Sequence, residues 1–353
     1  MAHVLIATSS SPAQPSPLLT VGVDLVARGH RVTVVTGTAG PRPEPVHALL
    51  NSLREALRDN TIDVAIADRT CTGLIGLAVG DRTRRPPVLQ WTPAPGRLAD
   101  AGANLDVRPA RIVVPSVPAF ECPGESVPDT VRFVGAVYAP MTRAPMTQAP
   151  VTWAPVTCDP RWRPPHQLPD RPVVHVAQRS ARGAGDLVAP TLAALADEDV
   201  TVVVTTGGPA PAGGPMPANV RVVETISDVV PFPAVTVTDG GGDAVPRALS
   251  SGVPLVIGGG VHSDTGARVA RSGAGIHLGD APVTPERVRA AVRTVLGDRR
   301  YVCRARYFEA AFARRDGLAE IAALVDEVVA GYRGIRTDGC RRPRPNPAAR
   351  PLH

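Results

Sequence analysis

The sequence predicts an α/β protein built from two parallel-sheet domains. The chain has 353 residues, 44% of them apolar, which is enough material for two hydrophobic cores. Short apolar runs of strand length alternate with segments whose apolar residues recur at helical spacing, and this βα alternation is typical of parallel sheets. A proline-rich repeat divides the alternation into two halves, so we expect one domain on each side of it.

The first half opens with a βαβ unit. An apolar run at residues 3–8 predicts a strand, Leu18, Leu25 and their neighbours predict a helix, and residues 31–36 predict the next strand. Gly29 stands where a glycine commonly ends a helix. Further elements are expected as a helix with apolar positions from 46 to 57 and strands at 63–67, 88–91, 111–114 and 131–134. The first domain is therefore expected to cover residues 1–138.

Residues 139–158 repeat a five-residue unit that begins with Ala-Pro each time. Proline at every fifth position excludes a helix and disfavours the interior of a sheet. A unit this short and polar builds no core, so the repeat predicts an extended linker rather than a solenoid. With the prolines that follow it, the linker is expected to span residues 139–171.

The alternation resumes at Pro172 and continues to residue 331. Thr284-Pro-Glu predicts a helix start, with Thr284 as N-cap and proline in the first turn. A helical stretch at 299–329 is expected to finish this second domain, and 332–353 to form a basic disordered tail. The other expected strands are at 173–177, 201–205, 221–223, 235–238, 255–257 and 275–278, and the other expected helices lie around 187–196, up to 250 and around 267–271.

Composition excludes several classes of protein. All 38 basic residues are arginine, a pattern typical of a GC-rich genome, so the net charge of +6 says little about partners. Five widely separated cysteines give no zinc or disulfide pattern, so no metal is expected. No stretch approaches the roughly 20 apolar residues of a membrane span. We therefore expect a cytoplasmic protein without membrane contact, and the tail alone does not point to nucleic acid.

Residues 235–257 are the most informative stretch of the chain. They predict a buried strand, a glycine turn, a short helix and a second strand, an arrangement that directs helix N-terminal N–H groups at a phosphate. The turn itself is Asp239-Gly-Gly-Gly-Asp243, so carboxylates stand where a diphosphate favours positive potential. Either Asp239 caps the turn or helix when no ligand is bound, or it is protonated or turned away when a donor binds.

These features, in this order and spacing, resemble the GT-B glycosyltransferases, specifically the bacterial family that moves sugars from nucleoside diphosphates (UDP or TDP) onto natural-product acceptors. The resemblance covers about 290 residues. It implies two Rossmann-like domains facing a cleft, with the acceptor on the first domain and the nucleotide sugar on the second. The segments that carry it are 18–37, 131–135, 219–223, 248–254, 268–276 and 284–286.

On the acceptor side, the family's general-base histidine aligns with Gln14. An amide cannot take a proton at neutral pH, so the position of the expected base holds no base. The resemblance leaves deprotonation of the acceptor hydroxyl to water or to the substrate.

On the donor side, the resemblance points to a set of residues around the diphosphate and the sugar. Asp239 replaces a histidine of the family, and Arg179 replaces a glycine and offers a cation that offsets the acid. The family's sugar-reading pair aligns with positions 261–262, and a shift of a few residues would bring Asp264 nearer. The expected donor-site residues are Arg179, Ser180, Asp239, Gly240, Gly241, Gly242, Asp243, His262 and Asp264.

Two functions follow from the resemblance. The first is a hexosyltransferase that uses a nucleotide sugar as co-substrate, needs no other cofactor and acts on a small-molecule acceptor. The second is a non-catalytic homologue with a degenerate active site, acting as a binding or auxiliary protein, and a catalytic partner that supplies missing groups is compatible with either.

Overall fold

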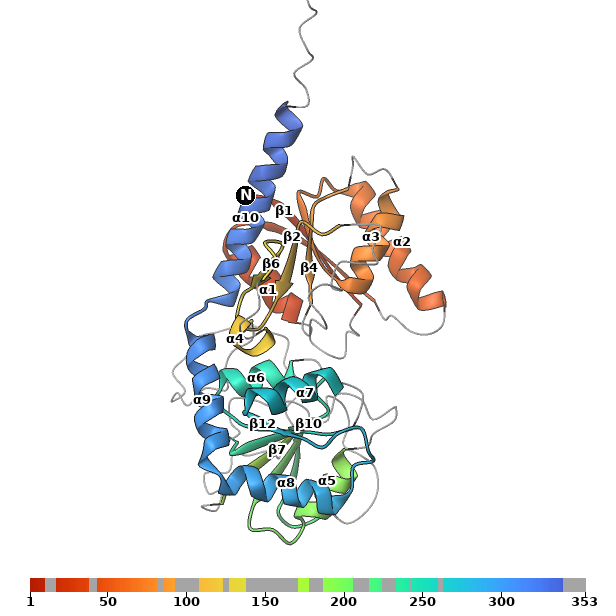
Figure 1. The fold of residues 1–353 in the computed structure, drawn as a ribbon. Helices are drawn as coiled ribbons and strands as arrows, with labels where there is room; N and C mark the ends of the chain where they lie inside the picture. Colours follow the sequence, from red (N-terminus) through yellow and green to blue (C-terminus); the bar gives the residue numbers. More distant parts are fainter. Residues whose placement is uncertain are drawn as a thin grey trace, which may run out of the picture.

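The computed structural model describes residues 1–9, 17–37, 43–80, 85–92, 108–122, 127–137, 171–177, 187–205, 216–223, 233–241, 243–259 and 263–338. These residues form two six-stranded sheets, one above the other in Figure 1, and every strand pair is parallel. The predicted α/β class with two parallel-sheet domains is confirmed.

The first sheet has the strand order β2-β1-β3-β4-β5-β6. Side chains alternate across it: Val4 and Ile6 of β1 pack toward α1, whereas Leu5 and Ala7 pack toward α2 and α3. Both faces are therefore covered, as the continuous apolar strands require. The elements of this domain are β1 (His3–Thr8), α1 (Pro17–Ala27), β2 (Arg31–Thr36), α2 (Pro43–Asp59), β3 (Val64–Asp68), α3 (Arg69–Val79), β4 (Val88–Trp91), β5 (Arg111–Val114), α4 (Pro118–Glu121) and β6 (Val131–Phe133).

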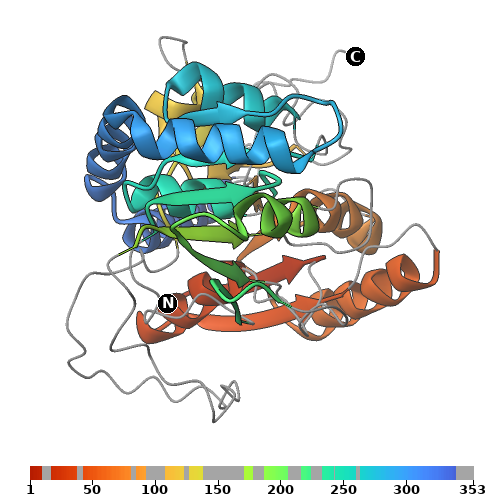
Figure 2. The ribbon, with the colours of Figure 1, turned by 90° about the horizontal axis from the view of Figure 1, so that it is seen from below.

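The second sheet has the order β12-β11-β10-β7-β8-β9. One face packs against α5 and α8, and the face at β10 and β11 packs against α6, α7 and α9. Figure 2 turns this domain toward the reader and shows its strands running beside α8. Its elements are β7 (Val173–Ala177), α5 (Val188–Leu195), β8 (Thr201–Thr205), β9 (Val220–Val223), β10 (Val235–Thr238), α6 (Ala244–Ser250), β11 (Leu255–Ile257), α7 (Ser263–Ser272), β12 (Gly275–His277), α8 (Pro285–Gly297) and α9 (Arg299–Ala313).

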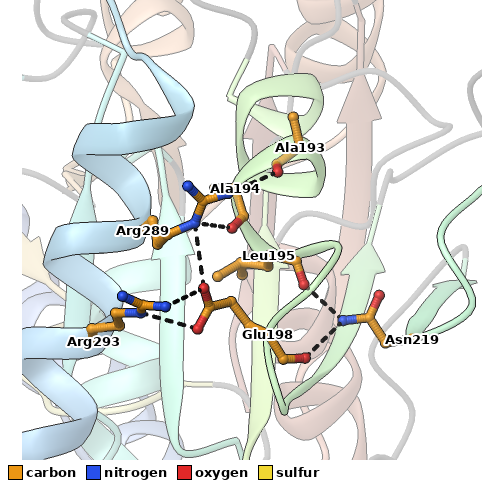
Figure 3. Close-up of polar contacts among 7 residues, drawn as sticks. All are labelled: Ala193, Ala194, Leu195, Glu198, Asn219, Arg289 and Arg293. Carbon is orange, nitrogen blue, oxygen red and sulfur yellow. Dashed lines mark hydrogen bonds and ion pairs between the residues drawn. The ribbon is translucent and has the colours of Figure 1, made fainter.

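A polar network ties α8 to the end of α5 (Figure 3). Glu198 accepts from Arg293 at 2.8 Å, and its carboxylate lies 3.3 Å from the Nε atom of Arg289. Asn219 donates to the carbonyl of Leu195 at 2.8 Å, which adds the turn before β9 to the same network. All of these groups belong to the second domain, so the network stabilises that domain alone.

The last helix, α10 (Gly317–Asp338), returns to the first domain. Ile321, Val325 and Val328 are buried in the same cluster as Val4 of β1, and Figure 1 shows α10 running alongside α1. This differs from the expected boundaries, which gave the stretch 299–329 to the second domain and began a disordered tail at residue 332. The apolar pattern of a helix shows that one face is to be buried but does not show which sheet buries it. Here the face of the first sheet next to α1 provides the partner for α10.

The two domains meet where α4 faces α6, α7 and α9 (Figure 1). Phe120 of α4 makes an edge-to-face contact with Phe308 of α9, with ring centroids 5.6 Å apart. Beside them, the start of α10 contacts the segment after β6: a Cβ at Gly317 would lie 2.4 Å from the carbonyl oxygen of Ala136. The two domains are therefore in close contact at this joint.

Local signals of the sequence recur in the structure. Gly29 has φ of 88°, and Thr284 caps α8 by accepting from the N–H of Arg287, with proline in the first turn. Helices α3 and α4 had no place in the sequence analysis, because α3 is apolar on most of its surface and α4 is a single turn. Within the described residues no helix is long and apolar enough to span a membrane.

Candidate functional site at the carboxyl edge of the second sheet

The candidate site lies where β10 ends and α6 begins. Val235 and Val237 point into the core under α5 and α8, which fixes the register of β10 between β7 and β11. The chain therefore leaves the centre of the sheet at Thr238 and enters the turn that the sequence singled out. Parallel strands end at one edge, so this turn shares its edge with the carboxyl ends of β7 and β11.

The turn is held by its own side chains. The Oδ1 atom of Asp239 accepts from the N–H of Gly241 at 2.9 Å, and the N–H of Gly240 donates to the hydroxyl of Thr238 at 3.3 Å. Gly240 has φ of 81°, which favours glycine over residues with a side chain. Asp239 is thus a turn residue rather than the helix cap. Its carboxylate accepts from the backbone N–H of Gly241, a donor of the kind that binds anions at such turns.

Asp243 stands at the N-cap position of α6, but its side chain makes no cap hydrogen bond. Its carboxylate instead pairs with Arg247 one turn later, at 2.9 Å from the Nη2 atom. The two side chains are 31% and 28% exposed, so solvent partly screens the pair. Arg247 was not among the expected site residues, although its spacing of four residues from Asp243 on a helix is a recognisable signal.

A buried histidine lies under the same edge. His175 of β7 faces Thr205 of β8, with 3.0 Å between its Nε2 atom and the hydroxyl. Burial, together with the positive charge of Arg247, lowers the pKa of His175 to about 3. The imidazole is therefore neutral at physiological pH and does not compete with Arg247 for anions.

Asp264 lies in the first turn of α7, with an exposed side chain. Because β10 and β11 are adjacent parallel strands, the start of α7 and the glycine turn lie at one edge of the sheet. The structure thus brings Asp264, Asp239, Gly240, Gly241 and Asp243 to the same edge. The other expected residues fall outside the described part of the chain: Gln14, Arg179, Ser180, Gly242 and His262.

On the first domain, Asp68 positions the entry to the segment that contains Gln14. Asp68 is the last residue of β3, caps α3 by accepting from the N–H of Cys71, and accepts from the Ser9 hydroxyl at 2.8 Å. Ser9 directly follows β1, so Asp68 fixes the point where the chain leaves the sheet. Asp68 was not among the expected residues, although an acid that ends a buried strand and starts a helix is a common cap signal.

The described residues contain no cluster of three or more His, Cys, Asp or Glu side chains that could hold a metal ion. The chemistry available at this edge is anion binding by backbone N–H groups and by arginine, opposed by two carboxylates.

Comparisons with known proteins agree with this architecture. Residues 189–328 match the family model "Erythromycin biosynthesis protein CIII-like, C-terminal domain". The chain is 36% identical over 235 residues to 4'-demethylrebeccamycin synthase of Lentzea aerocolonigenes, covering 64% of this chain and 52% of that protein. It is 33% identical over 241 residues to UDP-glycosyltransferase 2 of Phaeomoniella chlamydospora, covering 65% and 51%. The chain thus spans about half the length of the curated relatives it matches.

Solved structures resemble the whole fold. The glycosyltransferase of kitacinnamycin superimposes with a TM-score of 0.69 at 19% identity, over 93% of this chain and 99% of that chain. The spinosyn forosaminyltransferase gives a TM-score of 0.70 at 17% identity, with the same coverage. Two parallel sheets in this topology show that the chain has the GT-B glycosyltransferase fold, and its second domain matches the erythromycin-type family model.

Proposed function

We propose that the protein transfers a sugar from a nucleoside-diphosphate sugar to a hydroxyl group of a small natural-product acceptor. The observation that carries the proposal is the glycine turn between β10 and α6, at the carboxyl edge of a sheet whose domain matches the erythromycin-type family. Ligands of open parallel sheets bind at this edge. Neighbouring folds support the assignment of ligand classes, because one rhamnosyltransferase was solved with thymidine diphosphate and also with spinosyn aglycone.

The donor half of the reaction needs hydrogen-bond donors for the diphosphate leaving group. The N–H groups of Gly240 and Gly241 can serve as these donors once they no longer hydrogen-bond to the side chains of Thr238 and Asp239. A carboxylate about 4 Å from a phosphate charge costs roughly 4 kcal/mol at an effective dielectric of 20. Binding therefore requires Asp239 to turn away or to take up a proton, and Arg179 is the cation we expect to offset it.

The acceptor half lacks the usual base, because Gln14 stands at its position in the sequence. The acceptor hydroxyl attacks the anomeric carbon of the sugar while the bond from that carbon to the diphosphate breaks. The hydroxyl loses its proton late in this step, so water or the departing diphosphate can take the proton. We therefore propose a slow transferase whose rate depends on placing the two substrates rather than on strong base catalysis.

The alternative is a non-catalytic homologue that binds a ligand or assists a partner enzyme. The two carboxylates in the turn favour this alternative, because they oppose the binding of a diphosphate. The names of the relatives favour sugar transfer. An enzyme and a binding protein differ in one measurable respect, which is turnover of the donor.

The test has two stages. Thermal shift with UDP and TDP at millimolar concentration should raise the melting temperature of the wild type and leave that of Arg179→Ala unchanged. Chromatography should then detect release of free nucleoside diphosphate from UDP- and TDP-sugars in the presence of aglycone mixtures. Binding without any release would favour the auxiliary protein, and no shift with either nucleotide would contradict the donor site itself.

A further inference from the structure

A buried ion pair joins the two domains. Arg268 of α7 lies 3.4 Å from Glu121, the last residue of α4, measured from Nε to Oε2. The side chains are only 9% and 3% exposed, and they come from different domains. Buried pairs are weak sources of stability, since apolar residues of similar volume often serve as well. The pair therefore calls for another role, such as fixing one orientation of the domains.

The surroundings make each partner depend on the other. Phe120 and Val117 pack into the apolar cluster of α6, α7 and α9 on one side of Glu121. Burial raises the pKa of Glu121, while the charge of Arg268 and the hydroxyl of Ser116 lower it. Removal of Glu121 would leave the guanidinium of Arg268 desolvated and unpaired, and removal of Arg268 would leave a desolvated carboxyl whose pKa rises further, so the contact tolerates little displacement of α4 against α7.

Arg268 also reaches the start of its own helix. Its Nη2 atom donates to the hydroxyl of Thr265 at 3.1 Å, and Thr265 is buried. Thr265 directly follows Asp264 in the first turn of α7, which lies at the same sheet edge as the glycine turn. One guanidinium thus touches the first domain and the site-facing turn of the second.

We propose that Arg268 is a positioning residue which, through Glu121 and Thr265, sets the first turn of α7 relative to the first domain. The proposal rests on the proposed function in one respect: the first turn of α7 then faces the donor sugar, and the first domain carries the acceptor. Small errors in placing two reactants slow a transfer strongly while changing the affinity for either one little. Loss of the pair should therefore reduce kcat much more than nucleotide affinity.

The decisive variant replaces both partners, Glu121→Leu with Arg268→Met. It leaves no unpaired buried charge, so its melting temperature should lie close to that of the wild type. We expect kcat for transfer to fall tenfold or more, with the Kd for the nucleoside diphosphate changed less than twofold. Arg293→Met is the matched control, because it breaks an arginine–glutamate pair inside the second domain and should change neither quantity.

A distance measurement supplies a readout that needs no chemistry. Spin labels on the exposed native Cys303 of α9 and on Leu77→Cys of α3 report the separation of the domains, in a chain with Cys158 and Cys340 replaced by serine. The wild type should give a narrow distance distribution, and the double variant a broadened or displaced one.

A double variant with wild-type kcat and an unchanged distance distribution would overturn the proposal. If that variant does not fold, Thr265→Val decides, since a lowered kcat at an unchanged melting temperature supports positioning and a wild-type kcat refutes it. If the wild type itself turns over no donor, the proposed function fails, and the distance distribution alone judges the positioning role.

Discussion

The Oδ1 atom of Asp239 lies 2.9 Å from the backbone nitrogen of Gly241 and accepts its hydrogen bond. A carboxylate oxygen therefore holds the N–H group that a phosphate oxygen would use in a turn of this type. The chain carries its own anion at the candidate diphosphate site. Any nucleotide that binds there has to replace this contact and tolerate the displaced charge.

Replacement of Asp239 by asparagine should strengthen nucleotide binding. The amide oxygen still accepts from Gly241, so the turn is kept, while the negative charge is removed. Since the charge costs up to roughly 4 kcal/mol at 4 Å, we expect the Kd for UDP or TDP to fall at least tenfold by isothermal titration calorimetry. Asp239→His should act in the same direction.

The matched control for that change is Asp280→Asn, which removes an exposed carboxylate from the loop after β12. It should leave the Kd within twofold of the wild-type value. Equal Kd values for Asp239→Asn and wild type would show that the turn does not meet the diphosphate.

Arg247→Met should weaken nucleotide binding, because it leaves the carboxylate of Asp243 without the guanidinium at 2.9 Å. Both side chains are partly exposed, so the effect should be moderate, a threefold to tenfold rise in Kd corresponding to about 1 kcal/mol. Adding Asp243→Asn to the same chain should restore most of the affinity. A double variant as weak as the single one would mean that Arg247 acts directly on the ligand.

His175 should make the protein sensitive to acid. Its folded-state pKa is lowered from 6.5 to about 3, so below pH 6.5 the unfolded chain binds a proton that the folded chain does not. The contribution of neutral His175 to the free energy of unfolding is fully present above pH 6.5. Below that pH the free energy of unfolding falls by about 1.4 kcal/mol for each pH unit, until the pH approaches 3.

Urea unfolding at pH 7 and pH 5 checks this term. The loss of unfolding free energy between the two should shrink by about 2 kcal/mol in His175→Gln. His47→Gln changes an exposed histidine of α2 and should preserve the wild-type loss. Identical losses in all three proteins would refute a buried neutral histidine.

Two glycines of α10 should respond to alanine in opposite ways. At Gly317 a Cβ would lie 2.4 Å from the carbonyl oxygen of Ala136. Gly317→Ala therefore pushes the start of α10 away from the segment after β6 and should lower the free energy of unfolding by about 1–3 kcal/mol. At Gly331 nothing lies within 4 Å, and alanine favours the helix by about 1 kcal/mol. Thermal unfolding should therefore lower the melting temperature of the first variant and raise that of the second, and a similar shift in both would contradict the packed joint.

The local order of the elements was predictable from the sequence because its signals are local. Valine-rich runs of strand length, amphipathic spacing in α2 and α8, and the cap at Thr284 each act within a few residues. The glycine turn was found in the same way, since a strand, three glycines and a helix are contiguous. The cap of Asp68 and the pair of Arg247 with Asp243 are equally local, and their spacing in the sequence is sufficient to predict both.

Contacts between distant segments were decided only by the tertiary structure. Glu121 and Arg268 belong to different domains, and neither residue carries a local sign of its partner. The apolar face of α10 fits either sheet by pattern, and its place on the first domain depends on which sheet face remained uncovered. Periodicity encodes that a face is to be buried, whereas the partner that buries it is fixed by packing and charge over the whole chain.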